Sequence, residues 1–457
     1  MGKVESKSSR STTGTTTAKT QSYLLVAAFD FGTTYSGYAF SFRNDPLKVH
    51  TNQTWYSGGA GNLISLKTST SLLINPEGEF DSFGFQAEDS YANKAEDDNH
   101  HGWRQVMFFS RSWGIQIMKA VLADLCIPTL SRTTTVEDIE GNSHQALPIF
   151  SMAIKFLQTH LLQAVANQTV GVLEKDICYV ITVPAIWDDN AKEFMRTAVK
   201  ETGIDETRVT LALEPEAASI WCETLDVDTR AALAGTGTQY MVIDLGGGTA
   251  DISIQEKEQG GTLKEIHKPT GGPWGGTYVD AKYLKFLEHI FGEKAITSLK
   301  TEEMADYFDV IREFETKKRT FSVQTEDKFT FKISATTRKL SEKFTGQNLE
   351  QRIGSLGYGD SVIVKGGDKL RVEPDIVRTW FDGPIDNLIG HVKNLLKEPK
   401  LIAVQTVVLV GGFGESAYVQ EKLRCEILDK RLIVPAEAGL AVLKGSVMFG
   451  QNPAIIT

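Results

Sequence analysis

The chain has 457 residues, of which 41% are hydrophobic and 23% charged, with 40 glycines and 4 cysteines. This is the composition of an ordinary globular protein, and it excludes a collagen-like, coiled-coil or wholly disordered chain. The 48 basic and 58 acidic side chains leave a net charge of −10, which disfavours nucleic acid as a partner. At about 150 residues per domain, the length predicts two or three domains.

The first 22 residues predict a disordered tail, because they are rich in Ser, Thr and Lys and hold almost no large apolar side chains. The first six, Met1 to Ser6, fit the short pattern for N-terminal myristoylation. The pattern is short and often matches by chance, so we favour a plain disordered start. We expect membrane contact only if Gly2 is acylated, and then only reversible contact.

A reducing compartment is expected from the cysteines, which show no metal-binding or disulfide-rich spacing. The apolar run of residues 24–29 is too short for a signal peptide, and no run approaches the ~18 residues of a membrane span. We therefore expect a cytoplasmic or nuclear protein. The cysteines are Cys126, Cys178, Cys222 and Cys425.

Two glycine-bearing hairpins are predicted about half a chain apart. In the first, a buried strand over 24–29 leads to a turn at 30–34 and a strand over 35–42, where aromatic residues alternate. In the second, a strand over 240–243 leads to a turn at 244–249 and a returning strand. This repeat predicts two similar halves that divide near the Gly/Thr-rich residues 234–238.

Helices are predicted between these strands. Residues 188–202 carry an apolar stripe with helical spacing, Asp188 as the N-cap and Gly203 as the stop. Further helices are expected after Gly275 and over about 302–321. The alternation of strands and helices predicts an α/β fold.

The two hairpin turns could form a phosphate site, because glycine-rich turns expose backbone N–H groups and Thr adds hydroxyl donors. A carboxylate would repel phosphate, but two converging carboxylates fit a Mg²⁺ ion that lies between them and the phosphates. The alternative is a pair of ordinary glycine turns. The candidates are Asp30, Thr33 and Thr34 with Asp244, Gly246, Gly247, Gly248 and Thr249.

Three further features are ambiguous from the residues alone. Glu214 follows an apolar strand, where α/β ligand sites form, but it could instead complement a helix dipole. The turn over 411–414 could approach a flat ligand or simply join a strand to a helix. The third feature is a polar stripe with helical spacing, whose periodicity favours a solvent-exposed helix face. It consists of Glu315, Lys318, Arg319 and Ser322.

Taken together, these segments resemble the motifs of the seventy-kilodalton heat-shock protein family, over nearly all of residues 24–450. The two hairpins are similar to its two phosphate motifs, residues 407–412 to its adenosine motif, and residues 183–189 and 435–445 to its connecting motifs. Trp187, the run from Pro435 and the Phe449 to Pro453 ending are most similar to the divergent heat shock 70 kDa protein 12 subfamily.

The resemblance implies an actin-like ATPase fold, with ATP or ADP in a cleft between two lobes that each have a ribonuclease-H-like core. Lobe I would span 23–235 and lobe II 236–457, with the final helix packing back on lobe I. We expect no separate substrate-binding domain. The implied partners are nucleotide and, as chaperone-type candidates, protein clients or co-chaperones.

The resemblance also implies roles for particular residues. Asp30 and Asp244 would hold Mg²⁺ through water, while Glu214 and Asp251 would support the metal and the attacking water. The phosphates would be bound by Gly32, Thr33, Thr34, Tyr35, Gly246, Gly247, Gly248 and Thr249. The adenosine would be bound by Glu315, Lys318, Arg319, Ser322, Gly411 and Gly412, which replaces the solvated-face interpretation of the helix.

Several positions depart from the family pattern. Glu88 stands where the family has a lysine near the γ-phosphate, and Lys94 or Arg104 is a candidate substitute. Phe413 replaces a serine and Glu415 an arginine near the base, while Ala436 replaces an acid. Because loss of one transition-state contact costs about two decades in rate, ATP binding is a firmer expectation than fast hydrolysis.

Three functions are therefore compared. The first is an ATP-binding, weakly hydrolysing chaperone-like protein whose lobes open and close with the nucleotide. The second is a nucleotide-gated signalling or scaffold protein with negligible hydrolysis, which Glu88 favours. The third is a metabolite kinase of the same fold, which the adenosine helix and the connecting motifs oppose.

Overall fold

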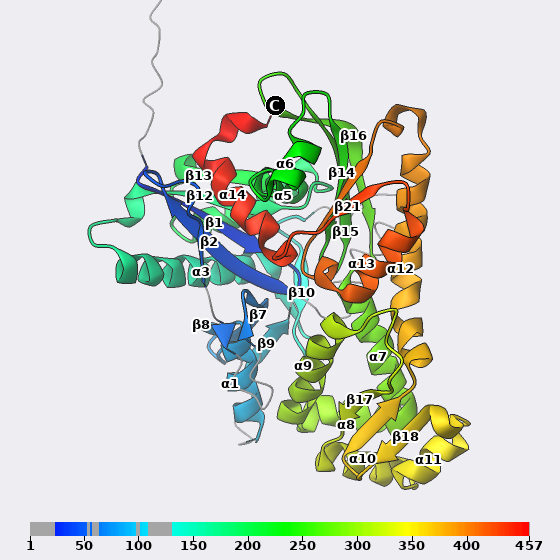
Figure 1. Cartoon of the computed structure of the whole chain (residues 1–457). Helices are drawn as coiled ribbons and strands as arrows, with labels where there is room; N and C mark the ends of the chain where they lie inside the picture. Colours follow the sequence, from blue (N-terminus) through cyan, green and yellow to red (C-terminus); the bar gives the residue numbers. More distant parts are fainter. Residues whose placement is uncertain (1–22, 53–54, 57–63, 97–100, 108–129, 457) are drawn as a thin grey trace, which may run out of the picture.

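The structure of the chain, a computed structural model, describes residues 23–52, 55–56, 64–96, 101–107 and 130–456. The predicted tail of residues 1–22 and the acylation pattern at Gly2 lie outside the described residues. Figure 1 shows the described part as two lobes, each built around a large β-sheet.

The sheet of lobe I has the strand order β13-β12-β1-β2-β3, and β6 also pairs with β2. Its strands are β1 (Leu25–Phe31), β2 (Tyr35–Phe42), β3 (His50–Thr51), β6 (Thr68–Ser69), β12 (Ile177–Val183) and β13 (Val209–Leu213). The sheet of lobe II has the order β21-β20-β14-β15-β16. Its strands are β14 (Gln239–Leu245), β15 (Ala250–Lys257), β16 (Leu263–Gly272), β20 (Thr406–Val410) and β21 (Arg431–Ile433).

The two sheets repeat one topology. The central strand β1 pairs in parallel with β12 and antiparallel with β2, and the central strand β14 pairs in parallel with β20 and antiparallel with β15. The outer strands β13 and β21 are also parallel to their neighbours. The α/β fold with two similar halves is therefore present, with one hairpin at the centre of each sheet, and it is the actin-like fold that the family resemblance implied.

The central strands β1 and β14 are apolar along most of their length because both faces of each sheet are covered. In β1, Leu25, Ala27 and Phe29 face a core with helices α3 (Ala146–Gln168) and α4 (Asp189–Glu201), while Val26 and Ala28 face the opposite core. That second core is shared with lobe II, and it contains side chains of β14, β20, α5 (Glu214–Cys222) and α14 (Ala441–Gln451).

The far face of the lobe II sheet is covered by a third core, built with α7 (Gly276–Phe291), α12 (Pro374–Leu396) and α13 (Ala417–Glu426). The remaining helices include α6 (Val227–Leu233), α8 (Glu293–Glu302), α10 (Ala335–Thr345) and α11 (Leu349–Ser355). The layers thus lie in this order: helices α3 and α4, the sheet of lobe I, helices α5 and α14, the sheet of lobe II, and helices α7 and α12 (Figure 1).

The predicted helices are present with small shifts at their ends. Helix α4 begins after Asp188, whose side chain accepts a hydrogen bond from the backbone N–H of Ala191, as expected of an N-cap. The helix expected over about 302–321 is α9 (Met304–Thr320), and Glu303 separates it from α8. The division of the lobes at residues 235 and 236 stays a prediction.

Each lobe also carries a smaller part at the same end of the molecule (Figure 1). In lobe I it holds α1 (Phe85–Glu96) and the strands β7 (Ser71–Ile74), β8 (Phe80–Phe83) and β9 (Arg104–Met107). In lobe II it holds α8 to α11 and the strands β17 (Phe329–Lys332), β18 (Val362–Lys365) and β19 (Lys369–Val372). The two smaller parts meet where α1 packs against α9 in an apolar cluster around Tyr91 and Phe308. The short pairs β4 (Trp55–Tyr56) with β5 (Ile64–Ser65), and β10 (Thr135–Glu137) with β11 (Ser143–Gln145), complete the described strands.

One described helix, α3, has the length and apolar composition of a membrane span. Half of its most apolar window is buried, and side chains such as Phe150, Ile154 and Leu157 pack in the core under β1 and β2. A core helix of this kind passes the same test, so α3 is weak evidence for a membrane location.

Candidate functional site

The two predicted hairpin turns meet between the lobes. Asp30 lies near the end of β1 and Asp244 near the end of β14, so equivalent strands carry the two acids to one place. The turns themselves are in direct contact, because a Cβ atom on Gly247 would overlap the hydroxyl of Thr34. A side chain at Gly247 would therefore push the two turns apart.

A cleft of ≈ 360 Å³ lies at this meeting point. It is lined by the predicted acids Asp30, Glu214, Asp244 and Asp251, by all the predicted phosphate-binding residues, and by Arg319, Gly411 and Gly412. The predicted phosphate-binding residues are Gly32, Thr33, Thr34, Tyr35, Gly246, Gly247, Gly248 and Thr249. The structure thus brings together residues that lie up to about 380 positions apart in the sequence.

Three acids of the cleft, Glu214, Asp244 and Asp251, hold protons more tightly than exposed acids do. Burial and the nearby charges of Asp244, Asp30 and Asp251 raise the pKa of Glu214 well above its usual value. Burial and Asp30 raise the pKa of Asp244 to about 7, against the opposing effect of Lys67. Burial and Asp244 raise the pKa of Asp251 to about 8. A cation bound here would therefore be favoured, because it would offset the repulsion between the buried carboxylates.

Lys67 is a cleft residue that the sequence analysis missed. Its Nζ lies 2.5 Å from Oδ2 of Asp30, whose Oδ1 accepts a hydrogen bond from the Thr182 hydroxyl at 3.2 Å. Burial alone would lower the pKa of Lys67, but Asp30, Asp244 and Glu214 together raise it, so its ammonium group stays charged. No familiar motif surrounds Lys67, and only the pairing of β6 with β2 brings it to the cleft.

Glu88 pairs with an arginine of the other lobe. It lies on α1, outside the lining of the cleft, and its Oε2 is 2.9 Å from Nη2 of Arg312 on α9. Arg312 also pairs with Asp89 at 2.8 Å. The proposed substitutes are elsewhere too: Lys94 lies over the ring of Trp103, and Arg104 does not line the cleft. Glu88 therefore does not line the cleft, and a carboxylate beside the γ-phosphate stays a prediction.

The helix predicted to bind adenosine presents one of its four polar side chains to the cleft. Arg319 lines it, while Glu315 lies behind and accepts hydrogen bonds from Nε and Nη2 of Arg319 at 3.1 and 3.0 Å. Lys318 is buried between Asp280 at 2.7 Å and Glu315 at 2.6 Å. The Ser322 hydroxyl lies 3.3 Å from that of Thr325. A nucleoside contact by Glu315, Lys318 or Ser322 stays a prediction.

Of the three other departures from the family pattern, only Glu415 lines the cleft. Its Oε1 accepts a hydrogen bond from the backbone N–H of Gly439 at 2.9 Å, and its Oε2 lies 3.8 Å from Arg319. Phe413 is buried in the lobe II core, where its ring stacks on Phe381. Ala436 is exposed and does not line the cleft.

The residues of the cleft fit a magnesium nucleotide. Asp251 is only 2% exposed, and its Oδ1 has no hydrogen-bond partner, so this buried oxygen is left unsatisfied. The Thr34 hydroxyl is also buried without a partner. Within the described residues, no three His, Cys, Asp or Glu side chains could ligate an ion together. A metal held by Asp30 and Asp244 through water is compatible with this arrangement.

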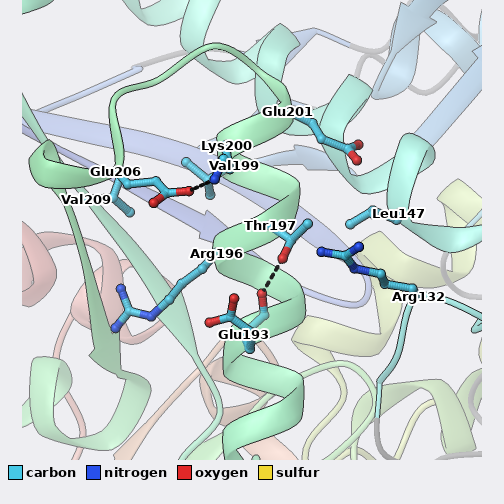
Figure 2. Close-up of a pocket in the computed structure, with 10 residues that line it drawn as sticks. All are labelled: Arg132, Leu147, Glu193, Arg196, Thr197, Val199, Lys200, Glu201, Glu206 and Val209. Carbon is cyan, nitrogen blue, oxygen red and sulfur yellow. Dashed lines mark hydrogen bonds and ion pairs between the residues drawn. The ribbon is translucent and has the colours of Figure 1, made fainter.

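A second cavity, of ≈ 630 Å³, lies beside α4 and the edge strand β13 (Figure 2). Several of its charged groups interact within the protein: Lys200 pairs with Glu206 at 2.6 Å, and Glu201 accepts a hydrogen bond from Ser151. Most of these charged side chains are exposed. The residues that the sequence singled out line the smaller cleft instead, which is therefore the candidate site.

The fold and the cleft define a two-lobed protein with the actin-like ATPase fold, and comparison with known proteins identifies the family. The Hsp70 protein family matches residues 140–356. Human heat shock 70 kDa proteins 12A and 12B are 31% and 32% identical, over 97% and 95% of this chain and 72% and 70% of those proteins. A chaperone protein HscA homolog of Acinetobacter baumannii is 29% identical over 54% of the chain and 32% of its own length.

The chain therefore belongs to the Hsp70 family, and it is similar over nearly its whole length to the divergent 12A and 12B members. This membership supports an ATP-binding protein of the Hsp70 type.

Proposed function

We propose that the chain binds ATP with Mg²⁺ in the cleft between its lobes, hydrolyses it slowly and opens or closes the lobes with the state of the nucleotide. The observation that carries the proposal is the meeting of the two hairpin turns around four acids and Lys67. Each feature alone occurs in many proteins, but their convergence matches the chemistry of a polyphosphate bound with a metal ion.

The chain would bind the phosphates mainly through its backbone. The turns at 32–35 and 246–249 offer N–H groups and Thr hydroxyls that face the cleft from opposite lobes. Such fixed donors stabilise charge without having to reorganise during the reaction. When bound, Mg²⁺ would offset the negative charge of the phosphates and of the acids that surround them.

Hydrolysis would rely on positioning rather than on a covalent intermediate. Water attacks the terminal phosphorus, the bond to the bridging oxygen breaks, and a carboxylate accepts the proton of the water. Glu214 and Asp251 line the cleft and have raised pKa values, which suits a group that must accept a proton near neutral pH. We assign them to orienting this water.

Closing and opening of the lobes would follow from where the cleft lies. It is bordered by Leu440 and Val442 next to the shared core and by Arg319 at the end of α9. A ligand that contacts both lobes stabilises the closed arrangement to the extent that it binds this arrangement more tightly than the open one. We propose a chaperone-like role on this basis, with protein clients or co-chaperones as partners. A cytoplasmic or nuclear location stays a prediction.

A calorimetric titration with ATP, with and without Mg²⁺, tests the proposed function. We expect saturable binding that weakens when the metal is chelated, and a loss of about tenfold or more in Asp244→Ala. The exposed Asp327→Ala serves as the matched control and should bind like the unsubstituted chain. Failure to bind ATP would contradict the proposal.

Hydrolysis is tested in a single-turnover assay with ATP and Mg²⁺. Slow turnover that Asp30→Ala or Asp244→Ala abolishes supports the ATPase. Tight binding without turnover would favour a nucleotide-gated signalling or scaffold protein, which the buried contact between Arg312 and Glu88 would suit because it joins the two lobes. Transfer of phosphate to added sugars or glycerol would favour a metabolite kinase.

A further inference from the structure

The cation at the phosphate end of the cleft does not come from the helix where the family resemblance places it. Position 88 is a glutamate that pairs with Arg312 and does not line the cleft. Among the described residues that line the cleft, the two side chains that carry a fixed positive charge are Lys67 and Arg319. Arg319 is instead engaged by Glu315, lies near Glu415, and has its guanidinium over the ring of Tyr35.

We propose that Lys67 is the residue that binds the polyphosphate of the nucleotide, in place of the lysine that the family carries at position 88. This inference rests on the proposed function of the cleft, and it names the cation that this chain uses there.

The backbone around Lys67 fixes its position. It directly precedes β6, where Thr68 and Ser69 pair with Ser36 and Tyr35 of β2. The same strand β2 returns from the first phosphate turn, so Lys67 is anchored to the wall of the site. Its carbon chain passes over Gly37, because a Cβ atom on that residue would lie 3.1 Å from Cγ of Lys67. The ammonium group is therefore directed to the cleft rather than to solvent.

The contacts of Lys67 leave it able to bind an anion. An ammonium group has three N–H donors, and the hydrogen bond that occupies Lys67 in this structure goes to Oδ2 of Asp30. Asp30 is also the acid expected to face the metal. Binding of a metal nucleotide would draw the Asp30 carboxylate toward the metal and leave Nζ of Lys67 to a phosphate oxygen. In the free protein, the pair holds both groups in place.

Position 88 could not take over this role. Glu88 is 5% exposed and is held on α1 by Arg312 of α9. A lysine there would place a second cation against the Arg312 guanidinium, which costs stability and adds no charge to the cleft. The structure thus separates two roles: Glu88 joins α1 to α9, and Lys67 faces the phosphates.

The test compares adenosine ligands that differ only in the number of phosphates they carry. Adenosine, ADP and ATP are titrated by calorimetry with Mg²⁺ into the unsubstituted chain and into Lys67→Met, Lys67→Arg and the exposed control Lys285→Met. For Lys67→Met we expect affinity for ATP and ADP to fall by about tenfold or more, with adenosine unchanged. Lys67→Arg should recover part of the loss, because it restores the charge, and Lys285→Met should bind normally.

Three results would overturn the assignment. An equal loss for adenosine and ATP in Lys67→Met would mean that Lys67 only maintains the shape of the site. Recovery of ATP affinity in Lys67→Met combined with Glu88→Lys would mean that position 88 reaches the phosphates. If the unsubstituted chain binds ADP and ATP but Lys67→Met binds them equally well, this inference alone fails. If the unsubstituted chain binds no nucleotide, the proposed function fails with it.

Discussion

Asp251 is the acid in the cleft whose charge has the least compensation. It is 2% exposed, its Oδ1 has no hydrogen-bond partner, and burial next to Asp244 raises its pKa to about 8. An acid whose pKa is higher in the folded chain than in the unfolded chain stabilises the fold at low pH. That contribution is lost as the pH rises from about 4 through the folded pKa near 8.

We therefore predict that Asp251→Asn makes the nucleotide-free chain more stable at pH 9 but not at pH 4. Each factor of ten in proton affinity corresponds to about 1.4 kcal/mol, so the gain should raise the Tm by several degrees. Thermal unfolding from pH 4 to 9 measures it. The exposed Asp327→Asn should follow the unsubstituted chain at every pH. Parallel pH curves for all three proteins would contradict the prediction.

At the scale of single residues, the sequence predicted those residues of the cleft that belong to a local motif. Asp30, Asp244 and their turns were found because acid, glycine and threonine follow an apolar strand within a few positions. Lys67 was missed because the residues around it are small and polar and match no pattern. Its role depends on the pairing of β6 with β2, which joins segments more than 30 residues apart.

The contact between α1 and α9 is the link between the two smaller parts of the lobes. Nη2 of Arg312 on α9 lies 2.9 Å from Glu88 and 2.8 Å from Asp89 on α1, and these ionic contacts adjoin an apolar cluster around Tyr91 and Phe308. Both Arg312 and Glu88 are buried. Removal of one partner from such a pair leaves the other charge buried and unpaired, which is strongly destabilising.

We predict that Arg312→Ala releases bound ADP at least about tenfold faster, because the lobes lose a contact that must break when the cleft opens. Stopped-flow displacement of a fluorescent ADP analogue measures the rate. Arg338→Ala is the matched control: Arg338 also pairs with a glutamate, Glu350, but both lie within lobe II. Its release rate should not change, and equal rates for the two variants would show that the α1–α9 contact does not limit opening.

The elements themselves were predictable to different degrees. The two central hairpins and helix α4 follow from local alternation, an apolar stripe and an N-cap, so their bounds agree with the structure within about two residues. The α1–α9 contact joins residues more than 200 positions apart, and no spacing rule links them. The family comparison did not predict this contact either, since it related Glu88 only to the phosphates.

At the scale of the whole molecule, one core connects the two sheets. Helices α5 and α14 lie between them, and their side chains pack with Val26 and Val180 of the first sheet and Val242 and Val408 of the second. The last described helix thus belongs to the interface between the lobes. A change that separates α14 from α5 should therefore affect both lobes and the cleft between them, rather than one end of the chain.

The closest approach of these two helices is at Gly445, where a Cβ atom would overlap the backbone carbonyl of Ala217 in α5. We predict that Gly445→Ala lowers the stability by about 1–3 kcal/mol, as overpacking of a core does. It should also weaken ATP binding, because Leu440 and Val442 line the cleft at the start of α14. Differential scanning calorimetry and an ATP titration measure the two effects.

Gly354→Ala provides the control for this change. Gly354 lies in α11, where a Cβ atom would meet no other atom within 4 Å. Alanine is the better helix former, so this variant should be neutral or slightly more stable, with normal ATP affinity. If Gly445→Ala behaved the same way, α14 would not be packed against α5 in solution. If it lost stability but kept its ATP affinity, the shared core would support the fold without setting the width of the cleft.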